Sequence, residues 1–134
     1  MRVVPMIFCA ALCASALPVW AEGPMVGEKL FTQYCASCHG ADAKGTGPMA
    51  EYLTVAPVDL TTLSARNDGA FPMLKVIHII DGRSGLRAHG GPMPLFGDLF
   101  MAETDDGVER SYNEALETRG RVLSLATYLE ALQQ

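Results

Sequence analysis

Apolar residues recur at the spacing of an α-helix in three separate stretches of the chain. In the first stretch, Val26, Leu30 and Tyr34 stand four residues apart, so they share one face of a helix. We predict that this helix covers residues 25–38. Nowhere do apolar and polar residues alternate convincingly enough to predict a β-strand.

The second stretch is shorter and has a clear end. Met73, Ile77 and Ile80 share one helical face, and Gly82 follows as a residue type that commonly ends helices. We therefore predict a helix over residues 71–81.

The third stretch is the longest and begins with a capping signal. Ser111 and Glu114 have the spacing of a capping box, in which two side chains satisfy free backbone N–H groups at the start of a helix. Gly120 leaves the continuity of the helix open at that point, because glycine is a poor helix former. The apolar stripe of this helix comprises Val122, Leu125, Ala126 and Leu129.

Long segments rich in glycine, proline and small polar residues separate these helices. They cover residues 40–48, 56–69 and 83–97. The predicted fold is therefore a small all-α protein with three or more helices and unusually long loops. Loops of this length are uncommon in a compact domain unless they have something to pack on.

The amino-terminal segment has the composition of an export signal. Arg2 supplies a positive charge, residues 3–17 are mostly apolar, and small residues end the segment at Ala21. We predict a signal peptide over residues 1–21 and a single domain over residues 22–134. The apolar run is short for a bilayer, so no membrane span is expected after cleavage, although a retained anchor is the alternative.

Cleavage at this point changes both the charge and the cysteine content. The chain has 10 basic and 15 acidic residues, and loss of Arg2 alone leaves nine basic residues and a net charge of −6. Such a domain is a poor candidate for nucleic acid, which requires clustered basic residues. Cys9 and Cys13 leave with the signal, so only Cys35 and Cys38 remain, and one pair cannot build a disulfide framework.

The remaining cysteines belong to the motif Cys35-Ala-Ser-Cys38-His39. C-x-x-C-H is the attachment signature of c-type haem. Each sulfur adds to one vinyl group, the two-residue gap lets a single turn of chain reach both groups, and the histidine lies under the iron. We predict one covalently attached haem c, with Cys35 and Cys38 as its thioether residues and His39 as an iron ligand.

Two other uses of a C-x-x-C pair fit this chain less well. A thioredoxin-like redox enzyme places the pair in a βαβ unit, which the sequence does not predict. A structural zinc site takes four ligands, and the mature chain has no second cysteine pair to complete one.

With these residues the chain resembles the class I c-type cytochromes. Gly27 and Phe31 match the first helix of that family, and "GTGP" at residues 45–48 matches the loop under the haem. The stretch "RVLSLATYLEAL" matches the last helix. The stretch "IDGRSGLRAHGGPMP" resembles a bacterial branch of exported members, which implies a periplasmic location.

The resemblance implies roles for two further residues. The carbonyl group of Pro48 is expected to accept a hydrogen bond from His39 and so fix the orientation of the imidazole ring. Tyr128 is expected to cross the first helix near Gly27.

An electron carrier also fills the sixth position of the iron, and the family does so with methionine. Met93 lies between two prolines and after two glycines, and it matches the ligand-bearing "MP" segment of the family. Met101 is the reserve candidate. Met73 is expected to be a core residue, and Met25 and Met49 lie too close to the attachment site. The residues expected to line the haem are Leu60, Ile77, Leu95, Phe96 and Leu99, although ordinary core packing explains them equally well.

The resemblance implies a carrier of single electrons and not an enzyme. Donors would be a dehydrogenase or a quinol-oxidising complex, and acceptors an oxidase or a reductase, with the chain acting as a monomer or as a subunit of a redox complex. One alternative is a ligand-binding or peroxidase-like haem protein in which Met93 is displaced or never bound; another is a subunit of one particular dehydrogenase. The acidic segment 103–109 is ordinarily a solvated loop, but it would also suit a basic redox partner.

Overall fold

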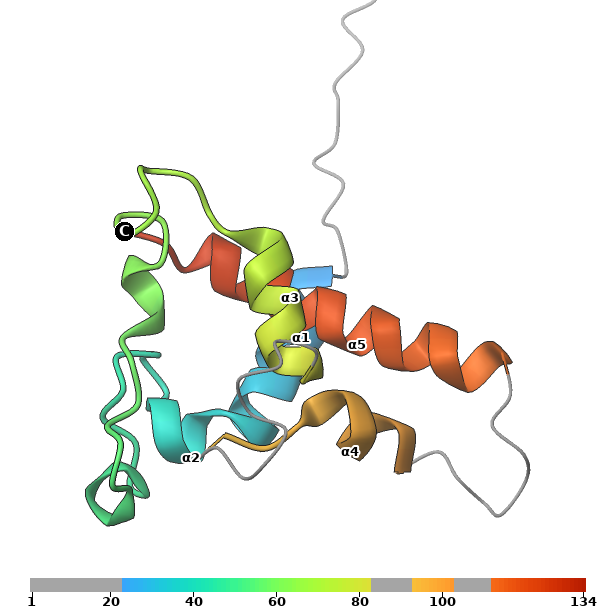
Figure 1. The fold of residues 1–134 in the computed structure, drawn as a ribbon, viewed down its shortest axis with the longest axis horizontal. Coiled ribbons are helices and arrows are strands. Elements are labelled where there is room, and N and C mark those ends of the chain that lie inside the picture. Colours follow the sequence, from blue (N-terminus) through green and yellow to red (C-terminus); the bar gives the residue numbers. More distant parts are fainter. Residues whose placement is uncertain (1–22, 83–92, 103–111) are drawn as a thin grey trace, which may run out of the picture.

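The computed structural model describes residues 23–82, 93–102 and 112–134 (Figure 1). Within these ranges the protein consists of helices and loops without a strand, which confirms the all-α fold. The predicted signal peptide, most of the loop that precedes Met93 and the acidic segment 103–109 lie outside the described residues. In chain order the elements are α1 (Gly23–Tyr34), α2 (Ala36–His39), η1 (Ala50–Tyr52), η2 (Leu60–Thr62), α3 (Met73–Asp81), α4 (Phe96–Ala102) and α5 (Tyr112–Ala131).

The first predicted helix is divided in two. α1 ends at Tyr34, and Cys35 forms a turn before the single turn of α2. The carbonyl group of Cys35 accepts hydrogen bonds from the N–H groups of Cys38 and His39, at 3.1 and 2.9 Å. The C-x-x-C-H motif therefore forms a tight turn of its own at the end of α1.

α1 and α5 form the most extensive helix pair and cross at Gly27 (Figure 1). A Cβ atom added to Gly27 would lie 2.6 Å from the Cβ atom of Tyr128 and even closer to the carbonyl oxygen of Ser124. The rings of Phe31 and Tyr128 meet beside this crossing with centroids 5.5 Å apart. The predicted approach of Tyr128 to Gly27 is thus confirmed.

The other two predicted helices are present with small changes. α3 begins at Met73 and ends where Gly82, at φ +93°, donates its N–H group to the carbonyl group of His78 at 3.1 Å. α5 runs from Tyr112 to Ala131 and continues through Gly120 without a break. Among the helices of the described ranges, none is both long and apolar enough to cross a membrane.

α4 was not predicted from the sequence, where its first residues were assigned to a loop. Its seven residues include Gly97 and offer too short an apolar pattern to mark a helix. Packing holds it in place instead, since Phe96 and Phe100 are buried and both meet the ring of Tyr34, with centroids 6.2 and 5.3 Å away. The guanidinium group of Arg121 lies 5.8 Å from the centre of the Phe100 ring, which joins α4 to α5.

The carboxyl-terminal residues fasten the loop that contains η2. The side-chain amide of Gln133 donates to the carbonyl groups of Leu60 and Leu129, at 2.8 and 2.7 Å. Its oxygen accepts from the N–H group of Ser64 at 2.8 Å, and the N–H group of Gln134 donates to the carbonyl group of Thr61 at 3.1 Å. This loop is therefore held against the end of α5 by residues about 70 positions away along the chain.

The α1–α5 crossing predicts the effect of filling Gly27. Gly27→Ala is expected to lower the free energy of unfolding by about 1–3 kcal/mol, because the added methyl group meets the backbone of α5 and forces the helices apart. Urea unfolding followed by circular dichroism measures this change.

The matched control is Gly120→Ala, because a Cβ atom added to Gly120 has no other atom within 4 Å. This substitution is expected to stabilise α5 by up to about 1 kcal/mol. Equal effects of the two substitutions would contradict the close crossing.

Candidate functional site

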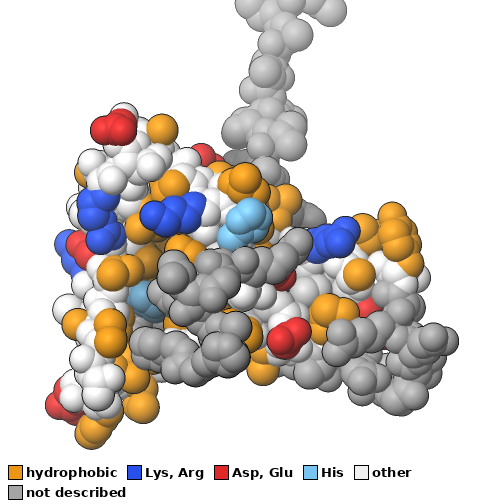
Figure 2. Space-filling model, viewed as in Figure 1, with side chains coloured by type: hydrophobic (Ala, Val, Ile, Leu, Met, Phe, Trp, Pro, Cys, Tyr) orange, Lys and Arg blue, Asp and Glu red, His pale blue; other side chains and the backbone are white. Residues whose placement is uncertain are grey.

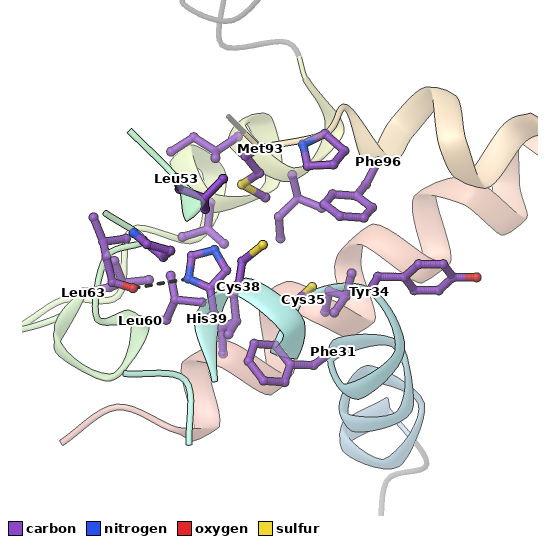
Figure 3. Close-up of a pocket in the computed structure, with 18 of the residues that line it drawn as sticks. Phe31, Tyr34, Cys35, Cys38, His39, Leu53, Leu60, Leu63, Met93 and Phe96 are labelled. Atoms are coloured by element: carbon purple, nitrogen blue, oxygen red, sulfur yellow. Dashed lines mark hydrogen bonds between the residues drawn. The ribbon is translucent and has the colours of Figure 1, made fainter. Parts of the chain in front are cut away.

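A cleft of about 210 Å³ opens between helices α1 to α5, η2 and the loop before η2 (Figure 3). Its walls are almost entirely apolar. The exceptions are the two thiols of Cys35 and Cys38, the imidazole of His39 and the thioether of Met93, whereas the hydroxyl group of Tyr34 points away from the cleft (Figure 3). The cleft thus gathers three sulfur atoms and one imidazole within an apolar enclosure.

The thiol of Cys35 lies in surroundings that disfavour its charged form. Burial raises the pKa of Cys35 to about 12, with a smaller contribution from the neighbouring Cys38. A reactive redox thiol has the opposite property, a lowered pKa that makes it a thiolate at neutral pH. The site therefore does not suit a thioredoxin-like enzyme.

The imidazole of His39 lies beside a backbone carbonyl group, that of Val58. Its Nδ1 atom lies 3.3 Å from the carbonyl oxygen of Val58, shown dashed in Figure 3. A proton on Nδ1 donates to this oxygen and leaves Nε2 as the nitrogen with a free lone pair for a metal. The hydrogen bond that the resemblance implies between His39 and the carbonyl group of Pro48 stays a prediction.

The close approach of two loops explains why Val58 reaches His39. Gly45 adopts φ +82° and donates its N–H group to the carbonyl group of His39 at 2.7 Å, which folds the loop back on α2. A Cβ atom on Gly45 would collide with the carbonyl group of Pro57. The bare glycine therefore lets residues 57–58 pack beside the motif, and no feature of the sequence identified them beforehand.

Among the methionines of the described residues, Met93 is the one that lines the cleft. Figure 3 shows its sulfur directed into the space that His39 and Cys38 face from α2. Met25 and Met49 are exposed, and Met101 lines a different cleft, between α3, α4 and α5. Met73 packs against the core without lining this cleft.

The predicted lining is only partly right. Leu60 and Phe96 line the cleft, whereas Ile77, Leu95 and Leu99 do not. On α3 the predicted face lies toward the core, since Ile80 is buried and Met73 and Ile77 pack against the core half-buried. Val76, which was not predicted, is buried as well. The other apolar residues of the cleft were not predicted to line it; they are Phe31, Tyr34, Leu53, Val55, Ala56, Pro57, Val58, Leu63, Val76, Ile79, Ile80, Pro94, Leu125 and Leu129.

Asp59 holds η2, the short helix that presents Leu60 to the cleft. Its carboxylate accepts hydrogen bonds from the N–H and hydroxyl groups of Thr61, at 2.8 and 2.6 Å. Both bonds lower the pKa of Asp59, and the bond from the hydroxyl group of Thr61 has the larger effect. Thr61 itself is buried, so this cap is part of the wall's support.

The described residues contain no cluster of three or more His, Cys, Asp or Glu side chains arranged to hold a bare metal ion. A structural zinc site would require four such ligands. The donors in the cleft are instead separated by apolar surface, which suits a large apolar group that carries its own metal.

The family comparison agrees with this geometry. The family model described as Cytochrome c matches residues 25–107. The chain belongs to the cytochrome c family. Its cofactor is accordingly a covalently attached haem c with iron, and proteins of this family are generally electron carriers that work with redox partners. Neither a curated protein nor a solved structure matches the chain.

The match confirms the resemblance to class I c-type cytochromes and extends from α1 through α4. It includes every sulfur-containing and imidazole residue of the cleft, whereas α5 lies beyond it. The cleft fits a haem, because its apolar walls match the porphyrin and its donors are thiol, imidazole and thioether, the groups that attach and ligate haem in cytochromes c.

The cap at η2 predicts a pH dependence. Asp59→Asn is expected to be less stable than the natural protein at pH 7, because asparagine lacks the charge that strengthens both bonds to Thr61. Since the folded pKa of Asp59 is lowered, its stabilisation is present above about pH 4 and is lost as the pH falls through that lowered value. Urea unfolding at a series of pH values measures the difference, and a difference that stays constant down to acid pH contradicts the cap.

Proposed function

We propose that this chain is an exported c-type cytochrome that carries single electrons through one haem. In this proposal Cys35 and Cys38 form the two thioether bonds to the haem. His39 and Met93 are the axial ligands of its iron. The bound haem c supplies the reversible one-electron change of the iron.

One observation supports this proposal above all others. The imidazole of His39 and the thioether of Met93 come from segments more than 50 residues apart, yet both line the same apolar cleft (Figure 3). Ordinary core packing explains a buried methionine, but it does not explain a methionine that faces an imidazole and two thiols. A His/Met pair raises the reduction potential of iron and leaves no position open for a substrate.

The residues of the chain have separate tasks in this function. The carbonyl group of Val58 holds His39 in one orientation and tautomer. Phe31 and Phe96 line the cleft with almost no exposure of their own and keep water from the ligands. Burial of this kind also favours the reduced iron, because it disfavours extra charge within the cleft.

The location and the partners follow from the proposal and the sequence. We assign residues 1–21 to a signal peptide and residues 22–134 to the mature cytochrome in the periplasm. The donor is a dehydrogenase or a quinol-oxidising complex, and the acceptor is an oxidase or a reductase. The net charge of −6 after cleavage favours basic surfaces on these partners.

The sixth ligand can be tested by spectroscopy. Met93→Ala is expected to abolish the thioether-to-iron band in the near-infrared spectrum of the oxidised protein and to lower the reduction potential. Carbon monoxide is expected to bind the reduced variant readily but not the reduced natural protein.

Met101→Ala is the matched control, because Met101 lines another cleft, and it is expected to keep the band. Ready binding of carbon monoxide to the natural protein would instead favour a ligand-binding or peroxidase-like haem protein with an open position.

Covalent attachment has its own test. Protein produced together with haem-attachment machinery is expected to keep its colour after denaturation and precipitation. The double substitution Cys35→Ala, Cys38→Ala is expected to lose the colour, whereas Met93→Ala keeps it, because ligation is not attachment. A colourless precipitate of the natural protein would refute the assignment of the thioethers.

A further inference from the structure

The segment that carries Met93 is anchored where α3 and α4 meet. Gly82 ends α3, and a Cβ atom added to it would lie 2.9 Å from the Cδ2 atom of Leu95. The chain after Met93 is therefore packed directly against the turn that ends α3. Asp81 and Gly97 make the next contact along the junction.

Gly97 fits this junction because it has no side chain. A Cβ atom there would lie 2.5 Å from both the carbonyl oxygen and the carboxylate oxygen Oδ1 of Asp81. The carboxylate can turn away, but the carbonyl oxygen is part of the backbone of Asp81, the last residue of α3, and cannot rotate independently of it. Any larger residue at position 97 must push the first turn of α4 away from α3.

The anchor is close enough to Met93 to control its position. Leu95 is two residues after Met93, and two residues of extended chain span at most about 7 Å. Pro94 lies between them and has a fixed φ, so the segment has little freedom to absorb a shift. Phe96 follows Leu95 directly and connects the contact between Leu95 and Gly82 to the cleft, because it lines the cleft and is only 3% exposed.

We infer that Gly97 is a positioning residue for Met93, and that its contact with Asp81 sets how readily the sixth iron ligand is displaced. The inference rests on the proposed function, in which Met93 is that ligand. A shift of α4 would carry Leu95 and Met93 with it and lengthen or break the bond from sulfur to iron. The contact between Asp81 and Gly97 thus determines how strongly Met93 binds the iron, although Met93 is not part of that contact.

The test substitutes Gly97→Ala in the haem-loaded protein and uses imidazole as the competing ligand. The imidazole concentration that replaces half of the thioether-to-iron band is expected to fall about tenfold, which corresponds to about 1.4 kcal/mol. The reduction potential is expected to fall as well. The unfolding temperature is measured in parallel.

Two controls separate positioning from general destabilisation. Gly120→Ala makes the same chemical change at a site with no neighbouring atom within 4 Å. Val122→Ala weakens the core at a buried residue that does not line the cleft. Both variants are expected to keep the imidazole affinity and the potential of the natural protein, although Val122→Ala lowers its unfolding temperature.

Leu95→Ala provides a second test if Gly97→Ala does not fold, because it loosens the contact with Gly82 without a clash. A severalfold rise in imidazole affinity in either variant supports the inference. The inference is overturned if Gly97→Ala folds and binds imidazole with the same affinity as the natural protein. It is also overturned if the imidazole affinity of Leu95→Ala equals that of Val122→Ala. If the natural protein shows no thioether band and Met93→Ala changes nothing, the ligand itself is wrong and the inference falls with it.

Discussion

The close crossing of α1 and α5 at Gly27 is the constraint on which the rest of the fold depends. The backbones of the two helices approach each other closely at Gly27, and Phe31 therefore lies between Tyr128 and the cleft. The turn that carries Cys35 and His39 follows directly from the end of α1, so the crossing also fixes the direction from which the motif enters the site. If the two helices lay farther apart at Gly27, the thiols and the imidazole would be displaced as one unit relative to the rest of the cleft.

The apolar side chains of this protein are shared between its own core and a cofactor. α5 contributes Leu125 and Leu129 to the core and to the cleft at once, and α4 contributes Phe96 in the same way. A chain of this size buries only a moderate fraction of its surface by itself. The long loops and short helices of the described ranges are therefore explained by their role as walls around a large apolar group. On one face of the molecule, apolar side chains remain visible between charged ones (Figure 2).

The parts that could be predicted from the sequence are those governed by local chemistry. The C-x-x-C-H motif and the stop at Gly82 depend on residue type and short spacing, and the family match or the structure agrees with each. The pairing of Gly27 with Tyr128 joins residues about 100 positions apart; the resemblance implied it, and the structure confirms it. Met93 lines the expected cleft, while its bond to iron stays a prediction. On α3 the predicted residues Met73, Ile77 and Ile80 do pack in or against the core, and Val76 was missed because apolar residues occur on several sides of this helix.

Other features depend on contacts between distant segments, which no local pattern reveals. α4 is held by packing with Tyr34, and Val58 reaches His39 only because Gly45 leaves room for its loop. The role of Pro48 rests on the resemblance alone and stays a prediction.

The bonds of Gln133 to the loop around η2 have a consequence for the order of folding. The N–H group of Leu60 donates to the carbonyl group of Ala43 at 2.8 Å, so nearby residues can hold this loop beside the motif early. Its bonds to Gln133 join it to the end of α5 from about 70 positions away, and they form only when α5 has docked. The wall that contains Leu60 therefore takes its final position together with the last helix.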